Sequence, residues 1–197
     1  MPPPGTDETT RARLLVAAGE LLLECGFAGI TTRAISERAG VNNALVHYHF
    51  GTKAQLLAEA ALGLLGEDMD RPVRMLRDAK SVSYGIRDVL TWIGELDIAE
   101  PAVRVLIELT VEAFNNEHVR PVVAGALEAG RAEMAAALGS RADVDATAAA
   151  PLAALLAALF DGVILHRMVA ADLDVAGWAE GVELLALPRP RPRRSAR

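Results

Sequence analysis

Cysteine is almost absent from this sequence of 197 residues, and the motifs of common enzymes are missing. Cys25 is the single cysteine, which excludes an internal disulfide and a cysteine-rich metal site. There is no Gly-rich phosphate loop, no Gly-x-Ser-x-Gly motif and no Cys–His pair at catalytic positions. The sequence therefore predicts a protein that is not an enzyme and that needs no metal or cofactor.

A signal for export is also lacking. Residues 1–5 show no basic start followed by an apolar run. The most apolar stretch, Ala146 to Ala171, contains Asp161, His166 and Arg167 and is rich in alanine, which favours a buried helix over a membrane span. We therefore expect a cytoplasmic protein without a membrane partner.

Basic residues are in the minority. Lys and Arg together number 20 against 26 Asp and Glu, which gives a net charge of −6. Nucleic-acid binders usually show a basic footprint, but a DNA contact needs only a local patch. Residues 1–57 hold five basic and five acidic side chains, so the acidic excess lies in the rest of the chain. The net charge therefore does not exclude DNA binding by the first part of the chain.

Aromatic residues make up only 4% of the sequence, whereas hydrophobic residues, mostly Ala, Leu and Val, make up 52%. Ala, Leu, Glu and Arg favour helices, and no alternating strand pattern is evident, so we predict an all-α fold. A polar lead-in over residues 1–8 is predicted to be disordered. The predicted helices run over residues 9 or 10–25, 32–40, 42–47 or 48, 52–65, 68–79, 83–96, 101–115, 117–138, 146–171 and 175–187.

A helix, a tight glycine turn and a short helix follow one another between Ile30 and Lys53. This order is typical of a helix-turn-helix, whose second helix enters the major groove of DNA. The apolar residues spaced to lock the two helices together are Ile35, Ala39, Val41, Val46 and Phe50. The residues left facing outward on the second helix are Asn43, Leu45, His47 and Tyr48.

The outward residue types suit DNA. Asn can read base edges, Leu can contact a thymine methyl, and Tyr or His can bind phosphate. Thr32, at a helix start, can offer a hydroxyl and an N–H to phosphate, Arg33 can reach a guanine or a phosphate, and Lys53 can anchor the backbone. A helix-turn-helix also occurs in helical proteins that bind nothing, so a structural adaptor is the alternative.

The segment from Arg11 to Leu57 resembles the DNA-binding domain of the TetR family. The resemblance lies in Ala17-Ala18, Gly26-Phe27, Ile30-Thr31-Thr32, Ala39-Gly40-Val41, His47-Tyr48-His49-Phe50 and Lys53-Ala54-Gln55-Leu56-Leu57. It implies a three-helix DNA-binding domain followed by a helical ligand-binding and dimerisation domain. It also implies a homodimeric repressor that binds an inverted-repeat operator in double-stranded DNA and is released by a small-molecule effector.

By this resemblance, the DNA-contacting positions are Thr32, Arg33, Asn43, Leu45, His47, Tyr48 and Lys53. His47 stands where the family more often has Tyr, and Leu45 where it more often has Thr or another small residue. Because of these two departures, the resemblance predicts the docking mode but not the operator sequence. We expect the DNA-binding domain over residues 9–66, the ligand-binding and dimerisation domain over 67–187, and a disordered Arg- and Pro-rich tail over 188–197.

The second half is predicted to hold the dimer interface and the effector site. The helices 146–171 and 175–187 are apolar on more than one face, which favours a subunit interface over an ordinary central helix. His118 and His166 without a carboxylate cluster do not indicate a metal site. The candidate effector-binding residues are Tyr84, Trp92, Glu112, Phe114, Asn115 and His166.

Overall fold

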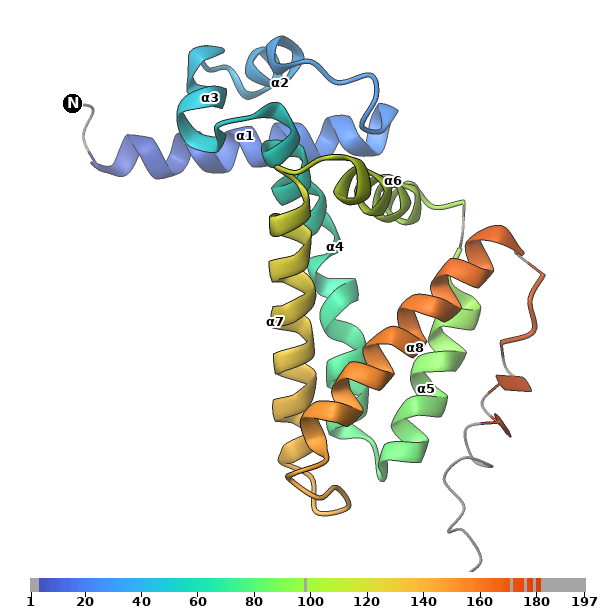
Figure 1. Ribbon diagram of the computed structural model, residues 1–197. Helices are drawn as coiled ribbons and strands as arrows, with labels where there is room; N and C mark the ends of the chain where they lie inside the picture. Colours follow the sequence, from blue (N-terminus) through green and yellow to red (C-terminus); the bar gives the residue numbers. More distant parts are fainter. Residues whose placement is uncertain (1–3, 98, 171, 176, 179, 182–197) are drawn as a thin grey trace, which may run out of the picture. The chain divides into compact units, whose positions relative to one another are not determined.

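The computed structural model describes residues 4–97, 99–170, 172–175, 177–178 and 180–181, and these residues form helices without any strand. This confirms the predicted all-α fold (Figure 1). The helices are α1 (Pro4–Cys25), α2 (Thr32–Ala39), α3 (Ala44–Phe50), α4 (Lys53–Asp78), α5 (Val82–Glu95), α6 (Pro101–Asn115), α7 (Arg120–Gly139) and α8 (Ala149–Val169).

The chain divides into two compact units. Unit 1 comprises the residues up to 71 together with 97–133, and unit 2 comprises 72–96 together with the residues from 134 onward. Each unit has its own hydrophobic core. The long helices α4 and α7 contribute one part to each unit.

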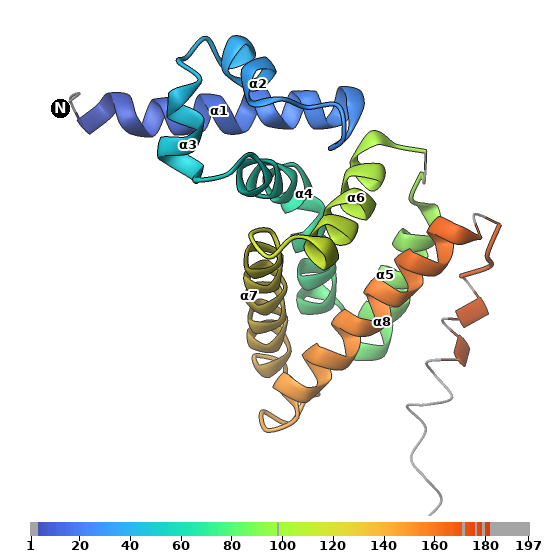
Figure 2. The same ribbon diagram turned by 45° about the horizontal axis from the view of Figure 1, so that its top comes forward.

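Unit 1 contains the helix-turn-helix. Helices α2 and α3 lie beside α1 in both views (Figures 1 and 2), and α6 also packs against α1. The predicted locking residues Ile35, Ala39, Val46 and Phe50 are buried in the unit 1 core, and Val41 packs against it. The same core includes Val105 and Leu109 of α6. The predicted inward face of the helix-turn-helix is therefore confirmed.

Unit 2 is built around α5 and α8, which lie side by side in both views (Figures 1 and 2). One face of α8 is buried against the core formed with Ile86, Val89, Leu90 and Ile93 of α5. The buried residues of that α8 face are Ala149, Ala153, Leu156, Phe160, Val163 and Arg167.

Two expected boundaries were wrong. Helix α1 begins at Pro4, whereas residues 1–8 were expected to be disordered. Proline is tolerated in the first helical turn because its missing N–H has no helical acceptor there, and Asp7 complements the positive end of the helix dipole. Similarly, α4 continues through Gly66, where a break was expected. Its packing in both cores offsets the roughly 1 kcal/mol that a helical glycine costs.

Smaller shifts occur at other helix ends. Helix α3 begins at Ala44, where a start at Asn42 was expected, and α7 begins at Arg120, where a start at 117 was expected. Of the expected helix 175–187, the described positions 177–178 and 180–181 are helical. Residues 182–187 and the expected tail 188–197 lie outside the described residues.

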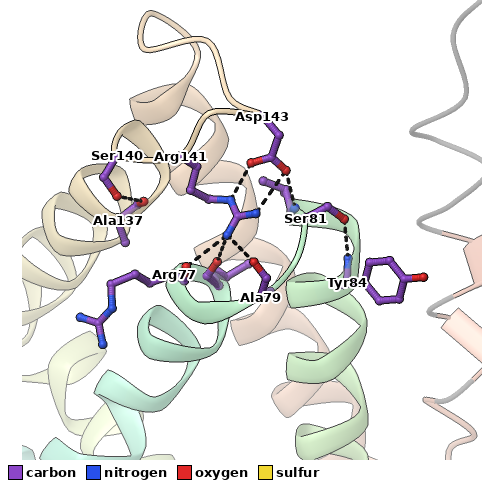
Figure 3. Close-up of polar contacts among 10 residues, drawn as sticks. Arg77, Ala79, Ser81, Tyr84, Ala137, Ser140, Arg141 and Asp143 are labelled. Carbon is purple, nitrogen blue, oxygen red and sulfur yellow. Dashed lines mark hydrogen bonds and ion pairs between the residues drawn. The ribbon is translucent and has the colours of Figure 1, made fainter.

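Arg141 joins three segments of unit 2 (Figure 3). Its side chain is only 8% exposed. Its Nη1 donates to the carbonyl oxygens that end α4, those of Leu76 at 2.8 Å, Arg77 at 3.2 Å and Ala79 at 2.9 Å. These carbonyls have no helical N–H to accept from, so the guanidinium acts as a C-terminal cap.

Asp143 completes this junction. It accepts from Nε of Arg141 at 2.8 Å and from the N–H of Val82, at the start of α5, at 2.9 Å. The Arg141 guanidinium holds the pKa of Asp143 below its ordinary value, and the Val82 N–H adds to this effect. The contacts fix the loop between α7 and α8 to the turn between α4 and α5.

We predict that Arg141→Met lowers the free energy of unfolding by about 2–4 kcal/mol, because it leaves several carbonyls and a carboxylate without their donor. Arg77→Met is the matched control, since its guanidinium is 54% exposed and pairs with the exposed Asp78. That control should change stability by about 0.5 kcal/mol or less. Urea denaturation of both variants measures the difference, and equal midpoints would contradict the capping role.

Candidate nucleic-acid interface

The start of α2 is capped by a side chain. Thr31 has an extended backbone, and its Oγ1 accepts from the N–H of Ala34 at 3.1 Å. The N–H groups of Thr32 and Arg33 belong to the first turn, where a helix supplies no carbonyl partner. Together with the helix dipole, such groups attract anions such as phosphate.

The turn between α2 and α3 depends on Gly40. Its φ of +64° lies in the left-handed region, where a side chain is strained. The N–H of Gly40 donates to the Glu37 carbonyl at 3.2 Å, and the N–H of Val41 donates to that of Ser36 at 3.0 Å. From α1, Arg13 donates to the carbonyls of Ala39 and Gly40, the latter at 3.2 Å. The turn is thereby tied to α1.

Helix α3 turns one face into the core and the other to solvent. Val46 is fully buried and Phe50 is 5% exposed. Asn43 and His47 are exposed, Tyr48 is 71% exposed, and Leu45 is partly buried. The structure therefore brings the predicted outward residues together, with Asn43 directly before α3 and the other three on that helix.

His47 is held by a carbonyl. Its Nδ1 lies 2.9 Å from the carbonyl oxygen of Gly51. Because a carbonyl only accepts, Nδ1 carries the hydrogen, and Nε2 of the neutral ring is an acceptor.

Lys53 begins α4 and reaches back across the unit. Its Nζ donates to the carbonyl of Ile30 at 2.7 Å, and thus fixes the segment that leads into α2. An ammonium has three donors, so further donors remain for another acceptor. Oγ1 of the preceding residue, Thr52, accepts from the N–H of Gln55 at 3.1 Å and thereby caps the start of α4.

Several arginines of unit 1 are paired with acids. Arg33 pairs with Glu37 across one turn of α2 at 2.8 Å, and the two side chains are 84% and 64% exposed. The hydrogen bond that Arg33 donates to Glu37 raises the pKa of Arg33. Arg38 forms two hydrogen bonds with Glu24, at 2.7 and 2.9 Å, which raise the pKa of Arg38 and lower that of Glu24. In this region, acidic side chains thus lie directly beside some of the basic side chains that they balance.

Asp7 and Arg13, which help to position α3, were not identified from the sequence. The side chain of His49 is 6% exposed, and its Nε2 lies 3.4 Å from Oδ1 of Asp7. This contact joins α3 to the first turn of α1. Asp7 was missed because residues 1–8 were expected to be disordered, and Arg13 gave no signal because its partners are backbone carbonyls.

Comparisons with known proteins identify the family. Residues 14–60 match the model of "Bacterial regulatory proteins, tetR family". The chain is 30% identical over 178 residues to the HTH-type transcriptional regulator BetI of Agrobacterium fabrum, and the match covers 89% of this chain and 85% of that relative. The chain belongs to the TetR family. It is therefore a DNA-binding transcriptional regulator with a helix-turn-helix, as its sequence predicts.

Solved structures agree with this TetR assignment. The crystal structure of the multidrug binding protein EbrR complexed with ethidium is 27% identical, with a TM-score of 0.65, and the match covers 91% of this chain and 99% of that one. A transcriptional regulator of Rhodococcus sp. Rha1, at 24% identity and a TM-score of 0.59, shares the fold over 87% of this chain and 90% of its own.

In this TetR-family chain, α6 is attached to the end of α1 by charged groups. Oε2 of Glu108 accepts from the N–H of Phe27 at 2.6 Å, and Arg104 donates to the carbonyl of Leu23 at 2.9 Å. Gly26, with φ of +69°, leaves room for the carboxylate, because a Cβ there would lie 2.6 Å from Oε2 of Glu108. Neither of these two contacts was predicted from the sequence, because both join segments 81 residues apart.

The predicted effector-binding residues fall into two groups. Glu112, Phe114 and Asn115 lie near the end of α6 in unit 1, where Phe114 is 80% exposed and the Asn115 amide donates to the Val111 carbonyl at 3.0 Å. Their effector contacts stay a prediction.

The other three predicted residues lie in unit 2. Tyr84 is 51% exposed, Trp92 packs against the core, and the His166 ring lies 5.9 Å from that of Trp178. Among the described residues, no group of three or more His, Cys, Asp or Glu side chains could hold a metal ion.

Proposed function

We propose that the chain is a homodimeric repressor, that its α3 helices enter the major groove at an inverted-repeat operator, and that a small molecule releases it. The observation that carries this proposal is the exposed face of α3, which combines Asn43, His47 and Tyr48 beside the capped start of α2. Two such helices related by a two-fold axis fit half-sites about 34 Å apart or a multiple of that distance.

Each predicted contact has a distinct role in this proposal. Asn43 and the Nε2 acceptor of His47 read base edges, and Leu45 contacts a thymine methyl. Tyr48 and Lys53 bind phosphate, and the N–H groups of Thr32 and Arg33 bind phosphate at the start of α2. The side chain of Arg33 reaches a guanine after it leaves Glu37.

The exposed face of α8 supports the dimer. Leu155 is 69% exposed, Leu159 36%, Leu165 62% and Val169 85%, and these residues recur at helical spacing opposite the buried face. Exposed apolar side chains in one stripe favour an interface with a second copy. We propose that α8 pairs with its copy across the two-fold axis.

A membrane is the other surface that such a stripe could contact. Helix α8 is long and apolar enough to cross a membrane by length and composition. However, its other face is packed in the unit 2 core and ends in a buried arginine, and the relatives are transcriptional regulators. A cytoplasmic homodimer accounts for both observations.

The effector is proposed from the relatives. EbrR has been crystallised with ethidium and with imidazole, so a related protein of the same fold binds small organic molecules. We propose that residues 9–66 bind DNA and that residues 67–187 bind the effector and dimerise. Within unit 2, the proposed effector contacts are Tyr84, Trp92 and His166.

We predict that Tyr48→Phe and Tyr48→Ala weaken operator binding roughly 10-fold or more, because a hydrogen bond to a charged group contributes about 1.5–3 kcal/mol. The measurement is fluorescence anisotropy with DNA flanking the protein's own gene, at two salt concentrations. Tyr84→Phe is the matched control, because Tyr84 is also exposed but lies in unit 2. Unchanged affinity in both Tyr48 variants would show that this face does not bind DNA.

We predict that Glu37→Gln tightens binding to DNA of any sequence by about 2- to 5-fold, because it frees Arg33 and removes a carboxylate that faces phosphate. Glu24→Gln is the control, since it breaks a comparable pair with Arg38 away from the proposed contacts. The same titration measures both variants. Weaker binding by Glu37→Gln would instead indicate that Glu37 itself contacts the operator.

We predict that the double variant Leu155→Glu, Leu165→Glu is monomeric in analytical ultracentrifugation, because two charges in the stripe would be desolvated at the interface. Val16→Glu, on the 62% exposed Val16 of α1, should remain dimeric. A dimeric double variant would place the interface elsewhere.

A further inference from the structure

Arg167 occupies a position in α8 where an apolar residue is expected. The buried face of α8 has a helical spacing of four and three residues, and Arg167 is its last member after Ala153, Leu156, Phe160 and Val163. The residue is 8% exposed, although arginine is rarely buried without a partner. A charge at the end of an otherwise apolar series calls for an explanation.

The guanidinium of Arg167 is only partly satisfied within the chain. Its Nη2 donates to the carbonyl of Leu96, at the end of α5, at 3.0 Å. Its Nε is buried and has no hydrogen-bond partner. Among the described residues, no carboxylate lies within ion-pairing distance of Arg167.

This arrangement is costly in the chain alone. A buried charge without a counter-ion is unfavourable, and an apolar residue of similar volume would pack at lower cost. The carbonyl of Leu96 and the negative end of α5 compensate part of the charge. They leave the Nε–H without an acceptor, which is costly for a buried donor.

The buried edge of the guanidinium that carries Nε suits a carboxylate. In a guanidinium, Nε–H and one N–H of the neighbouring Nη point in parallel, which matches the two oxygens of a carboxylate. The core that this face of α8 helps to form is apolar and includes aromatic groups. Trp92 is one helical turn before Leu96 on α5, and Ile164 and Leu173 pack against the same core. An anionic group on an apolar body suits these surroundings.

We propose that Arg167 binds the carboxylate of a small organic acid with an apolar body, and that this acid is the effector. The identity of the effector rests on the proposed ligand response, whereas the binding of an acid to Arg167 does not. The charge preference is opposite to that expected for a site that holds ethidium, a cation, as EbrR does.

The test measures thermal unfolding of the full-length protein with benzoate, phenylacetate and hexanoate, each compared with its neutral amide. At least one acid should raise the melting temperature by about 2–4 °C at millimolar concentration, because a ligand that binds only the folded state stabilises it. Its amide should not. Arg167→Met should abolish this rise, and Arg87→Met, a control in the same unit, should retain it.

A second measurement covers the case in which Arg167→Met does not fold. Isothermal titration of the wild type and of Arg167→Lys with the active acid should show binding weakened 10-fold or more in the lysine variant, because the two-pronged contact is lost. Inorganic phosphate should not compete at equal concentration, which separates a carboxylate from any anion.

Two results would overturn the proposal: no response to any of the three acids, or an equal response to acid and amide that persists in Arg167→Met. Fluorescence anisotropy of the protein–operator complex with added ligand separates this outcome from failure of the proposed function. If imidazole, which has also been crystallised with EbrR, displaces the protein from its operator while the acids neither bind nor displace it, the ligand response stands and the role of Arg167 falls. If an acid binds through Arg167 without releasing DNA, the site stands and its role as effector site falls.

Discussion

The outward face of α3 depends on how its inward face is packed. A helix as short as α3 is not stable alone, so its position comes from the burial of Val46 and Phe50 in the core of unit 1. The left-handed Gly40 and the contacts of Arg13 with the turn set its direction relative to α1. The side chains proposed to contact DNA are therefore aimed by residues that do not reach it.

The same core connects the helix-turn-helix to α6. Val105 and Leu109 share it with α1, and Glu108 and Arg104 add polar contacts to the last turn of α1 and the residues that follow. A shift of α6 would have to break these contacts or carry α1 with it, because buried polar groups are costly to leave unsatisfied. Within unit 1, α6 and the helix-turn-helix are therefore coupled through α1.

Helix α8 has different tasks on its two faces. One face closes the unit 2 core and ends in the partly satisfied Arg167, and the other is an unpaired apolar stripe. An apolar helix of this kind supports both an internal site and an interface with a second copy. At the N-terminal end of α8, the contacts of Arg141 and Asp143 hold the loop before α8 against the turn before α5.

The sequence by itself determined the all-helical fold, the family and the inward and outward residues of the helix-turn-helix. These features depend on local spacing and on a single glycine turn, and Ile35, Val46 and Phe50 are buried as predicted. The continuity of α4 through Gly66 and the early start of α1 were decided by tertiary packing, because local propensity is weaker than the burial of a helix face. The contacts of Glu108 with Phe27, of Lys53 with Ile30 and of Arg167 with Leu96 join segments distant in the chain. No periodicity encodes such contacts, since each depends on where two separate elements meet in space.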